Sequence, residues 1–175
     1  MSSTAAAPSF TKPTRQILSP ANVSAWLHSE AYAIYTKMLM DLNECVKRKS
    51  TTEQCTVSPA VQSVISVLDK IGSYIADFPP KDLDEQRFGN KAFRDWHAKV
   101  TQEAESLLAG MLHDTQKAAA VELAAYFLDS FGNATRIDYG SGHEACFIMM
   151  ICCLFRLNFF TKEDSFAVVI RLFDR

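Results

Sequence analysis

The stretch from Gly132 to Ala145, called the glycine loop below, concentrates residue types that could bind an anionic ligand. It carries three of the six glycines in the chain, and a long apolar run follows it. It also gathers charged and aromatic side chains, which are Arg136, Asp138, Tyr139, His143 and Glu144. Glycine is costly unless the backbone needs unusual dihedral angles or something approaches it closely. Because ligands often bind loops that a packed scaffold positions, we expect a ligand site here.

Three enzyme motifs nearly match the glycine loop, and each fails. The string from Gly140 to Ala145 fits the G-x-G-x-x-A dinucleotide fingerprint, but that motif needs a preceding strand and a βαβ unit. Phe147 stands where the second histidine of an HExxH zinc helix would be. Ser141 lacks the G-x-S-x-G spacing of a nucleophile elbow. No catalytic acid, base or nucleophile is therefore predicted.

Phosphate binding is the chemistry that remains for the glycine loop. Ser141 and Glu144 have the spacing of a capping box, so Ser141 is predicted to cap a helix that begins here. Free N–H groups and the dipole at such a helix start attract anions. Arg136 could add a bidentate contact to phosphate. Alternatively, Arg136 pairs with Asp138 or Glu144 and only locks the loop, and the sequence leaves both interpretations open.

A second candidate surface lies between Arg87 and Lys99. Asn90 is a predicted N-cap, and Phe93 and Trp96 begin an apolar stripe that should enter the core. The basic side chains point to another face of the same helix, as a candidate peptide or partner surface: Arg87, Lys91 and Arg94. The alternative is the solvated face of an ordinary amphipathic helix.

Hydrophobic spacing along the chain predicts an all-α fold with about six helices. Proline in the first turn follows a capping serine at Ser19 and at Ser58, and Thr161 with Asp164 forms a further capping box. The predicted helices cover residues 19–45, 58–78, 90–107, 116–131, 141–157 and 161–175. Residues 1–18, rich in Ser, Thr, Ala and Pro, are predicted to be a disordered tail, and residues 19–175 form one domain.

The composition limits the class of protein. The chain is 48% hydrophobic and 22% charged, with a formal net charge of -2, which excludes general affinity for nucleic acid. Five cysteines lack zinc-site spacing, and no signal peptide precedes them, so we expect reduced thiols in the cytoplasm and also the nucleus. The apolar run from Ala145 to Leu157 is too short to span a bilayer.

Two strings of the sequence resemble one protein family. They are Arg87-Phe-Gly-Asn-Lys-Ala-Phe-Arg-Asp-Trp-His-Ala-Lys99 and Gly132-Asn-Ala-Thr-Arg-Ile-Asp-Tyr-Gly-Ser-Gly-His-Glu144. Both closely resemble the phosphotyrosyl phosphatase activators, which are also called serine/threonine protein phosphatase 2A activators. The resemblance covers about residues 17–175. It implies an all-α protein with a core, a linker and a lid around a cleft.

The resemblance also implies activities and partners. Family members bind ATP with Mg²⁺, associate with the catalytic and scaffold subunits of phosphatase 2A, and are assigned peptidyl-prolyl cis-trans isomerase activity on proline-containing peptide segments. By this resemblance Arg136, Ser141 and Gly142 are nucleotide-binding residues. Asp138, Tyr139, Gly140, His143 and Glu144 would support the loop. No membrane partner is implied.

The resemblance further implies that family members continue past Arg175. A Gly-Val-Trp-Gly-Leu-Asp-Asp stretch there would supply the magnesium ligands, so the domain is expected to be incomplete at its C-terminal end and no metal ligand is assigned in this chain. A phosphatase activator with isomerase activity is the first hypothesis. Two others stay open: a non-catalytic binding module or chaperone for the phosphatase catalytic subunit, and a helical protein whose glycine loop only turns the chain.

Overall fold

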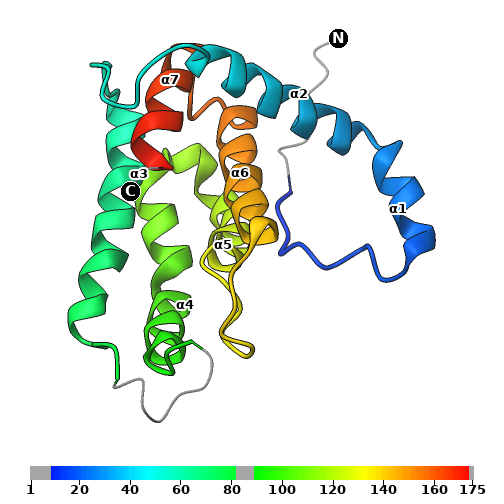
Figure 1. Ribbon diagram of the computed structural model, residues 1–175. Coiled ribbons are helices and arrows are strands. Elements are labelled where there is room, and N and C mark those ends of the chain that lie inside the picture. The colour runs from blue at the N-terminus through cyan, green and yellow to red at the C-terminus, as the bar shows by residue number, and fades with distance from the viewer. Residues whose placement is uncertain (1–8, 82–88, 174–175) are drawn as a thin grey trace.

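The computed structural model describes residues 9–81 and 89–173, and their regular structure is helical (Figure 1). The α-helices are α1 (Pro20–Leu27), α2 (Glu30–Val46), α3 (Pro59–Ser73), α4 (Ala92–Met111), α5 (Ala120–Asp129), α6 (Ser141–Arg156) and α7 (Ser165–Ala167). Shorter 3₁₀ and π turns extend α3, α5 and α7. The all-α prediction is confirmed. None of the described helices is long and apolar enough to cross a membrane.

Four helices build the body that positions the glycine loop. Helix α4 packs between α3 and α5, and α5 packs between α4 and α6 (Figure 1). The start signals at Ser19-Pro20 and Ser58-Pro59 are confirmed, and Ser58 Oγ accepts the N–H of Val61 at 3.2 Å. Fully buried apolar side chains fill the space between these helices, among them Val61, Val64, Val100, Leu108, Phe127, Met150, Ile151 and Leu154. This packing fixes where α5 ends and α6 begins.

The single long helix predicted after Ser19 is instead two helices. Helix α1 ends at Leu27, and α2 begins after Ser29. Ser29 Oγ donates to the carbonyl of Trp26 at 2.7 Å and accepts the N–H of Tyr32 at 3.1 Å, so one hydroxyl ends one helix and caps the next. The apolar period continues across the break, which explains why spacing alone missed it.

The last predicted helix contains a π turn that shifts its buried face. The capping box of Thr161 and Asp164 is confirmed, with the Asp164 carboxylate accepting the Thr161 N–H at 2.8 Å. The π turn from Val168 to Leu172 buries both of these residues. Phe173, which α-helical spacing places in the core, is 42% exposed. The extra residue in a π turn rotates every later side chain around the axis.

A polar cluster joins the end of α3 to α4. The hydroxyl of Tyr74, a buried residue, donates to the Glu103 carboxylate, which also accepts from Lys99. Trp96 Nε1 donates to the carbonyl of Ile71 at 3.0 Å. These contacts hold the first half of α4, and with it the side chains that reach the glycine loop.

The pKa of Tyr74 gives a pH test of this cluster. The hydrogen bond to Glu103, followed by burial and the Glu103 charge, raises the pKa of Tyr74 to about 12. A raised folded-state pKa means that the contribution to stability is complete below the unfolded tyrosine value and is lost as pH rises through the folded one. The free energy of unfolding should therefore fall from about pH 10 to about pH 12. Urea unfolding of Tyr74→Phe should show a smaller loss over that range; an equal loss would contradict the cluster.

Candidate functional site

Gly132 sets the geometry of the turn that follows α5. Its φ is +113°, and a Cβ there would lie 2.8 Å from the carbonyl oxygen of Asp138. The N–H of Asn133 donates to that same carbonyl at 3.0 Å, and the two residues form an isolated antiparallel bridge. The backbone of Asp138 thus approaches the start of the turn so closely that only glycine fits. For Gly132 the expectation of an unusual backbone is confirmed.

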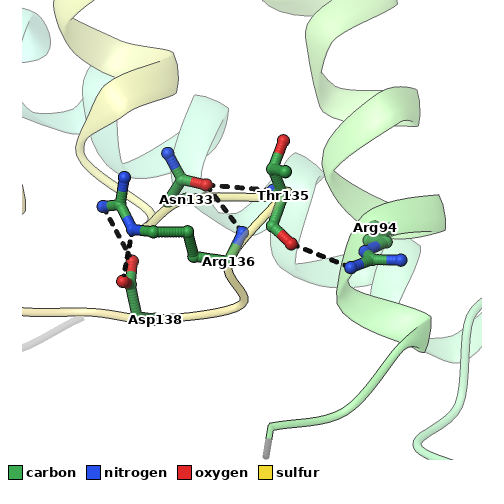
Figure 2. Close-up of polar contacts among 5 residues, drawn as sticks. All are labelled: Arg94, Asn133, Thr135, Arg136 and Asp138. Carbon is green, nitrogen blue, oxygen red and sulfur yellow. Dashed lines mark hydrogen bonds and ion pairs between the residues drawn. The ribbon is translucent and has the colours of Figure 1, made fainter.

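Asn133 organises the inside of the turn. Its Oδ1 accepts the N–H of Thr135 at 3.0 Å and that of Arg136 at 2.8 Å (Figure 2), while its carbonyl accepts the N–H of Ile137 at 2.7 Å. Ile137 has a φ of +54°, which is an outlier for a β-branched residue. A Cβ at Gly89, where φ is +59°, would lie 2.9 Å from the Ile137 carbonyl oxygen, so Gly89 packs directly on this strained residue.

Arg136 and Asp138 form a two-point ion pair on the outside of the turn. Arg136 Nε lies 2.5 Å from one carboxylate oxygen and Nη2 lies 3.0 Å from the other (Figure 2). The Arg136 side chain is still 63% exposed. Its hydrogen bonds lower the pKa of Asp138 and raise the pKa of Arg136. A guanidinium has five N–H donors, and this pair uses two, so Arg136 can be locked and still offer its other edge to a ligand.

Arg94 clamps the turn from α4. Its Nε donates to the carbonyl of Ala134 at 3.0 Å. Its Nη2 donates to the carbonyl of Thr135 at 2.8 Å, the bond drawn in Figure 2. Arg94 was predicted as a peptide or partner surface; in the structure its fork binds the glycine loop. Lys91 lies at the start of α4 and is exposed, and Arg87 lies outside the described residues. The partner-surface assignment of these residues stays a prediction.

Helix α6 begins differently from the sequence prediction. Gly140 is the N-cap, Ser141 is the first helical residue, and no side chain caps the helix. The predicted capping box of Ser141 and Glu144 is therefore wrong, because the extended backbone of Gly140 starts the helix one residue earlier. Gly140 and Gly142 have no atom within 4 Å of an added Cβ. Neither glycine is needed to avoid a backbone strain or a clash. Their lack of side chains leaves the first turn of α6 open to a ligand.

The first turn of α6 is tied to the end of α5 through His143. Its Nδ1 donates to the carbonyl of Asp129 at 2.5 Å, and Tyr139 stacks on its ring with centroids 5.6 Å apart. Cys146 donates its thiol to the Asp129 carboxylate at 3.1 Å. Burial and this hydrogen bond raise the pKa of the Cys146 thiol to about 12, so the side chain is not an activated nucleophile.

The donor set of the site suits phosphate. The first N–H groups of a helix lack intrahelical partners, and α6 adds no side-chain acceptor for them. Arg136 adds an exposed cationic fork. Glu144, in the first turn of α6, and Asp138 add negative charge that a phosphate must tolerate. Among the described residues, no group of three or more His, Cys, Asp or Glu side chains could hold a metal ion.

Sequence reasoning located the loop but missed the residues that shape it. The role of Asn133 inside the turn was not predicted, although asparagine in a turn commonly bonds the N–H groups that follow it. The hydrogen bonds of Arg94 to the turn were not predicted, because their acceptors, the carbonyls of Ala134 and Thr135, lie about forty residues away in the chain. No local signal could have paired them.

Comparison with known proteins gives one consistent result. Residues 13–175 match the sequence model of the family described as "Phosphotyrosyl phosphate activator (PTPA) protein". A serine/threonine-protein phosphatase 2A activator 1 from Mycosarcoma maydis is 42% identical over 162 residues, covering 90% of this chain and 33% of that protein. An activator from Drosophila melanogaster is 32% identical, covering 92% of this chain and 40% of that one.

A solved structure shares the fold. The crystal structure of the PP2A phosphatase activator Ypa1 superposes with a TM-score of 0.85 at 26% sequence identity. The match covers 95% of this chain and 55% of the other. The present chain thus spans between a third and about half of the lengths of these relatives.

The Arg94 clamp can be tested by hydrogen exchange. Arg94→Met removes two donors from the turn, so the amides of Arg136 and Ile137 should exchange about 3–10-fold faster, as expected for about 1 kcal/mol of lost hydrogen bonding. Arg94→Lys keeps the charge without the fork and should recover little protection. Arg156→Met, near the other end of α6, is the matched control. Unchanged exchange in Arg94→Met would show that the turn does not depend on the clamp.

Proposed function

The chain belongs to the phosphotyrosyl phosphate activator (PTPA) family, and we propose that it acts in the activation of serine/threonine protein phosphatase 2A through a nucleotide site at the start of α6. The observation that carries the site is the uncapped, open first turn of α6 beside an exposed arginine. The names of its relatives support the phosphatase role. The chain spans only part of the length of those relatives, so the activity of the whole proteins is proposed for it.

The nucleotide would be held by its phosphates. The backbone N–H groups of Ser141 and Gly142 face an open helix start, and the Ser141 hydroxyl, exposed in the same turn, adds a further donor. Arg136 approaches with the edge that Asp138 leaves free, and Asp138 fixes the orientation of the fork. Magnesium, when bound, neutralises charge on the phosphates, and Mg²⁺ commonly takes most of its ligands from phosphate and water.

Peptidyl-prolyl isomerisation is the second activity in the proposal. Rotation about a peptide bond has a barrier of about 18–20 kcal/mol. A protein lowers this barrier when it binds the twisted imide better than either planar form, which needs no acid, base or nucleophile. The described residues form no catalytic constellation around the glycine loop, which fits a reaction of this kind. The substrate would be a proline-containing segment of the phosphatase catalytic subunit or its scaffold.

A non-catalytic role in binding or chaperoning the phosphatase catalytic subunit is the alternative. The same lack of a catalytic constellation favours it equally. A prolyl isomerase assay on a proline peptide, with and without Mg-ATP, separates the two roles. Acceleration that depends on Mg-ATP supports the enzyme, and a flat trace together with retained binding to the phosphatase supports the binding module.

Calorimetric titration with Mg-ATP tests the nucleotide site. Arg136→Ala removes the cationic fork and should weaken binding at least about tenfold. Arg136→Lys keeps the charge without bidentate geometry, so its affinity for Mg-ATP should lie between those of Arg136→Ala and the unmodified chain. Lys37→Ala removes another exposed cation, which pairs with Asp41 on α2, and this variant should bind Mg-ATP as the unmodified chain does. Equal affinity of Arg136→Ala and the unmodified chain would refute the site.

A phosphatase activation assay tests the role of the α6 start. A side chain at Gly142 meets no atom but projects toward the N-terminus of the helix, over the free amides. Gly142→Leu should therefore abolish most of the Mg-ATP-dependent activation while the thermal midpoint stays equal or rises, since leucine favours helix. Gly72→Leu on α3, a position equally free of neighbours, is the matched control and should activate normally. Normal activation by Gly142→Leu would contradict the proposal.

A further inference from the structure

The connection between α2 and α3 is long and exposed. It runs from residue 47 to residue 58, whereas packed helices are usually joined by roughly 2–8 residues. Its first part, residues 47–54, is exposed at every position and forms no helix or strand. In Figure 1 this cyan loop lies at the top beside α7, and the yellow glycine loop lies lower, at the start of α6. The loop is therefore open to another protein and separate from the proposed nucleotide site.

Arg48 follows α2 in a backbone conformation that usually belongs to glycine. The helix ends at Val46, Lys47 is its C-cap, and Arg48 comes next with a φ of +63°. A left-handed residue after a C-cap is most often glycine, because a Cβ is crowded there. The Arg48 guanidinium does not offset this strain, since no hydrogen bond or ion pair within residues 9–81 and 89–173 engages it. Backbone strain that local contacts do not explain points to a function for the residue.

Ser50 has cations directly before it. Residues 47–49 are Lys, Arg and Lys, and the acidic Glu53 follows Ser50 at a distance of three residues. Ser50 Oγ accepts the N–H of Thr52 at 3.2 Å and shares a hydrogen bond with Thr52 Oγ1 at 2.7 Å, both within the exposed loop. A serine/threonine kinase with an acidic peptide groove selects a hydroxyl that follows such cations, because charge patterns set much of kinase specificity.

We propose that Ser50 is a phosphorylation site for a serine/threonine kinase whose peptide groove is acidic. Arg48, two residues before the acceptor, gives that groove a bidentate contact. The Ser50 hydroxyl oxygen bonds to the γ-phosphorus of ATP while the bond from that phosphorus to the β,γ-bridging oxygen breaks. The hydroxyl proton passes to the catalytic aspartate of the kinase, and ADP leaves. This modification does not depend on the proposed nucleotide site.

The phosphate would stand next to a contact that joins the loop to α7. Lys49 Nζ lies over the ring of Phe166, 4.3 Å from its centroid, where the end of α2 packs on α7. A phosphoserine carries a charge of about −1.5 to −2 near pH 7, which attracts an adjacent ammonium more strongly than an aromatic face does. Phosphorylation of Ser50 therefore draws Lys49 away from Phe166 and loosens α7.

Phosphate transfer to the full chain tests the site. The probe is the free catalytic subunit of cyclic-AMP-dependent protein kinase with Mg-ATP, and mass spectrometry locates the phosphate. Ser50 should be phosphorylated in the unmodified chain and in Thr51→Ala, the matched control, whereas Ser50→Ala should carry no phosphate in this loop. Arg48→Gly should lower the initial rate at least about tenfold. Its thermal midpoint should stay equal or rise, because glycine adopts a positive φ without strain.

No transfer to Ser50, or an unchanged rate in Arg48→Gly, would overturn the site. Hydrogen exchange tests the effect on α7. Amides of residues 165–172 should exchange about two- to fivefold faster in the phosphorylated chain, as expected when a surface cation–π contact is lost. Lys49→Met should show the same increase without phosphate. Equal exchange before and after phosphorylation would overturn the release of Lys49 from Phe166.

Discussion

The carbonyl of Asp138 lies so close to Gly132 that no side chain fits between them, and the candidate site depends on this approach. The backbone turns back on itself here after α5 and leaves again toward α6. Asn133 fills the inside of the turn with hydrogen bonds to the two N–H groups that follow it. The turn is therefore held mainly by main-chain atoms and one amide side chain.

That arrangement leaves the charged residues available for a ligand. Arg94 provides the second clamp from α4, and Trp96 and the Tyr74–Glu103 bond hold α4 itself against α3. Arg136 can then point outward while Asp138 orients its guanidinium. The same turn delivers Gly140 to the start of α6 without a capping side chain. A rigid turn next to an open helix start would suit the proposed phosphate site, because little conformational entropy would be lost when a phosphate binds.

The sequence predicted the helices well where local chemistry decides, as at the serine-proline starts of α1 and α3. It also located the glycine loop and correctly predicted that Gly132 has an unusual backbone conformation. The sequence could not show that Gly140 and Gly142 leave space at the start of α6 and adopt no strained backbone. Only the positions of the surrounding atoms reveal that space. The break at Ser29 and the π turn after Ala167 were missed because the apolar period continues across both. The hydrogen bonds from Arg94 to the glycine loop were not predicted because their acceptors are distant in the chain.

We propose that the first turn of α6 and Arg136 together bind the phosphates of a nucleotide. Amide-resolved NMR during a titration with Mg-ATP tests it most directly. We expect saturable shifts concentrated at the backbone amides of Ser141 and Gly142 and at the Nε of Arg136, with little change in α3. Shifts confined to other helices, or no saturable shift in the glycine loop at millimolar nucleotide, would contradict it.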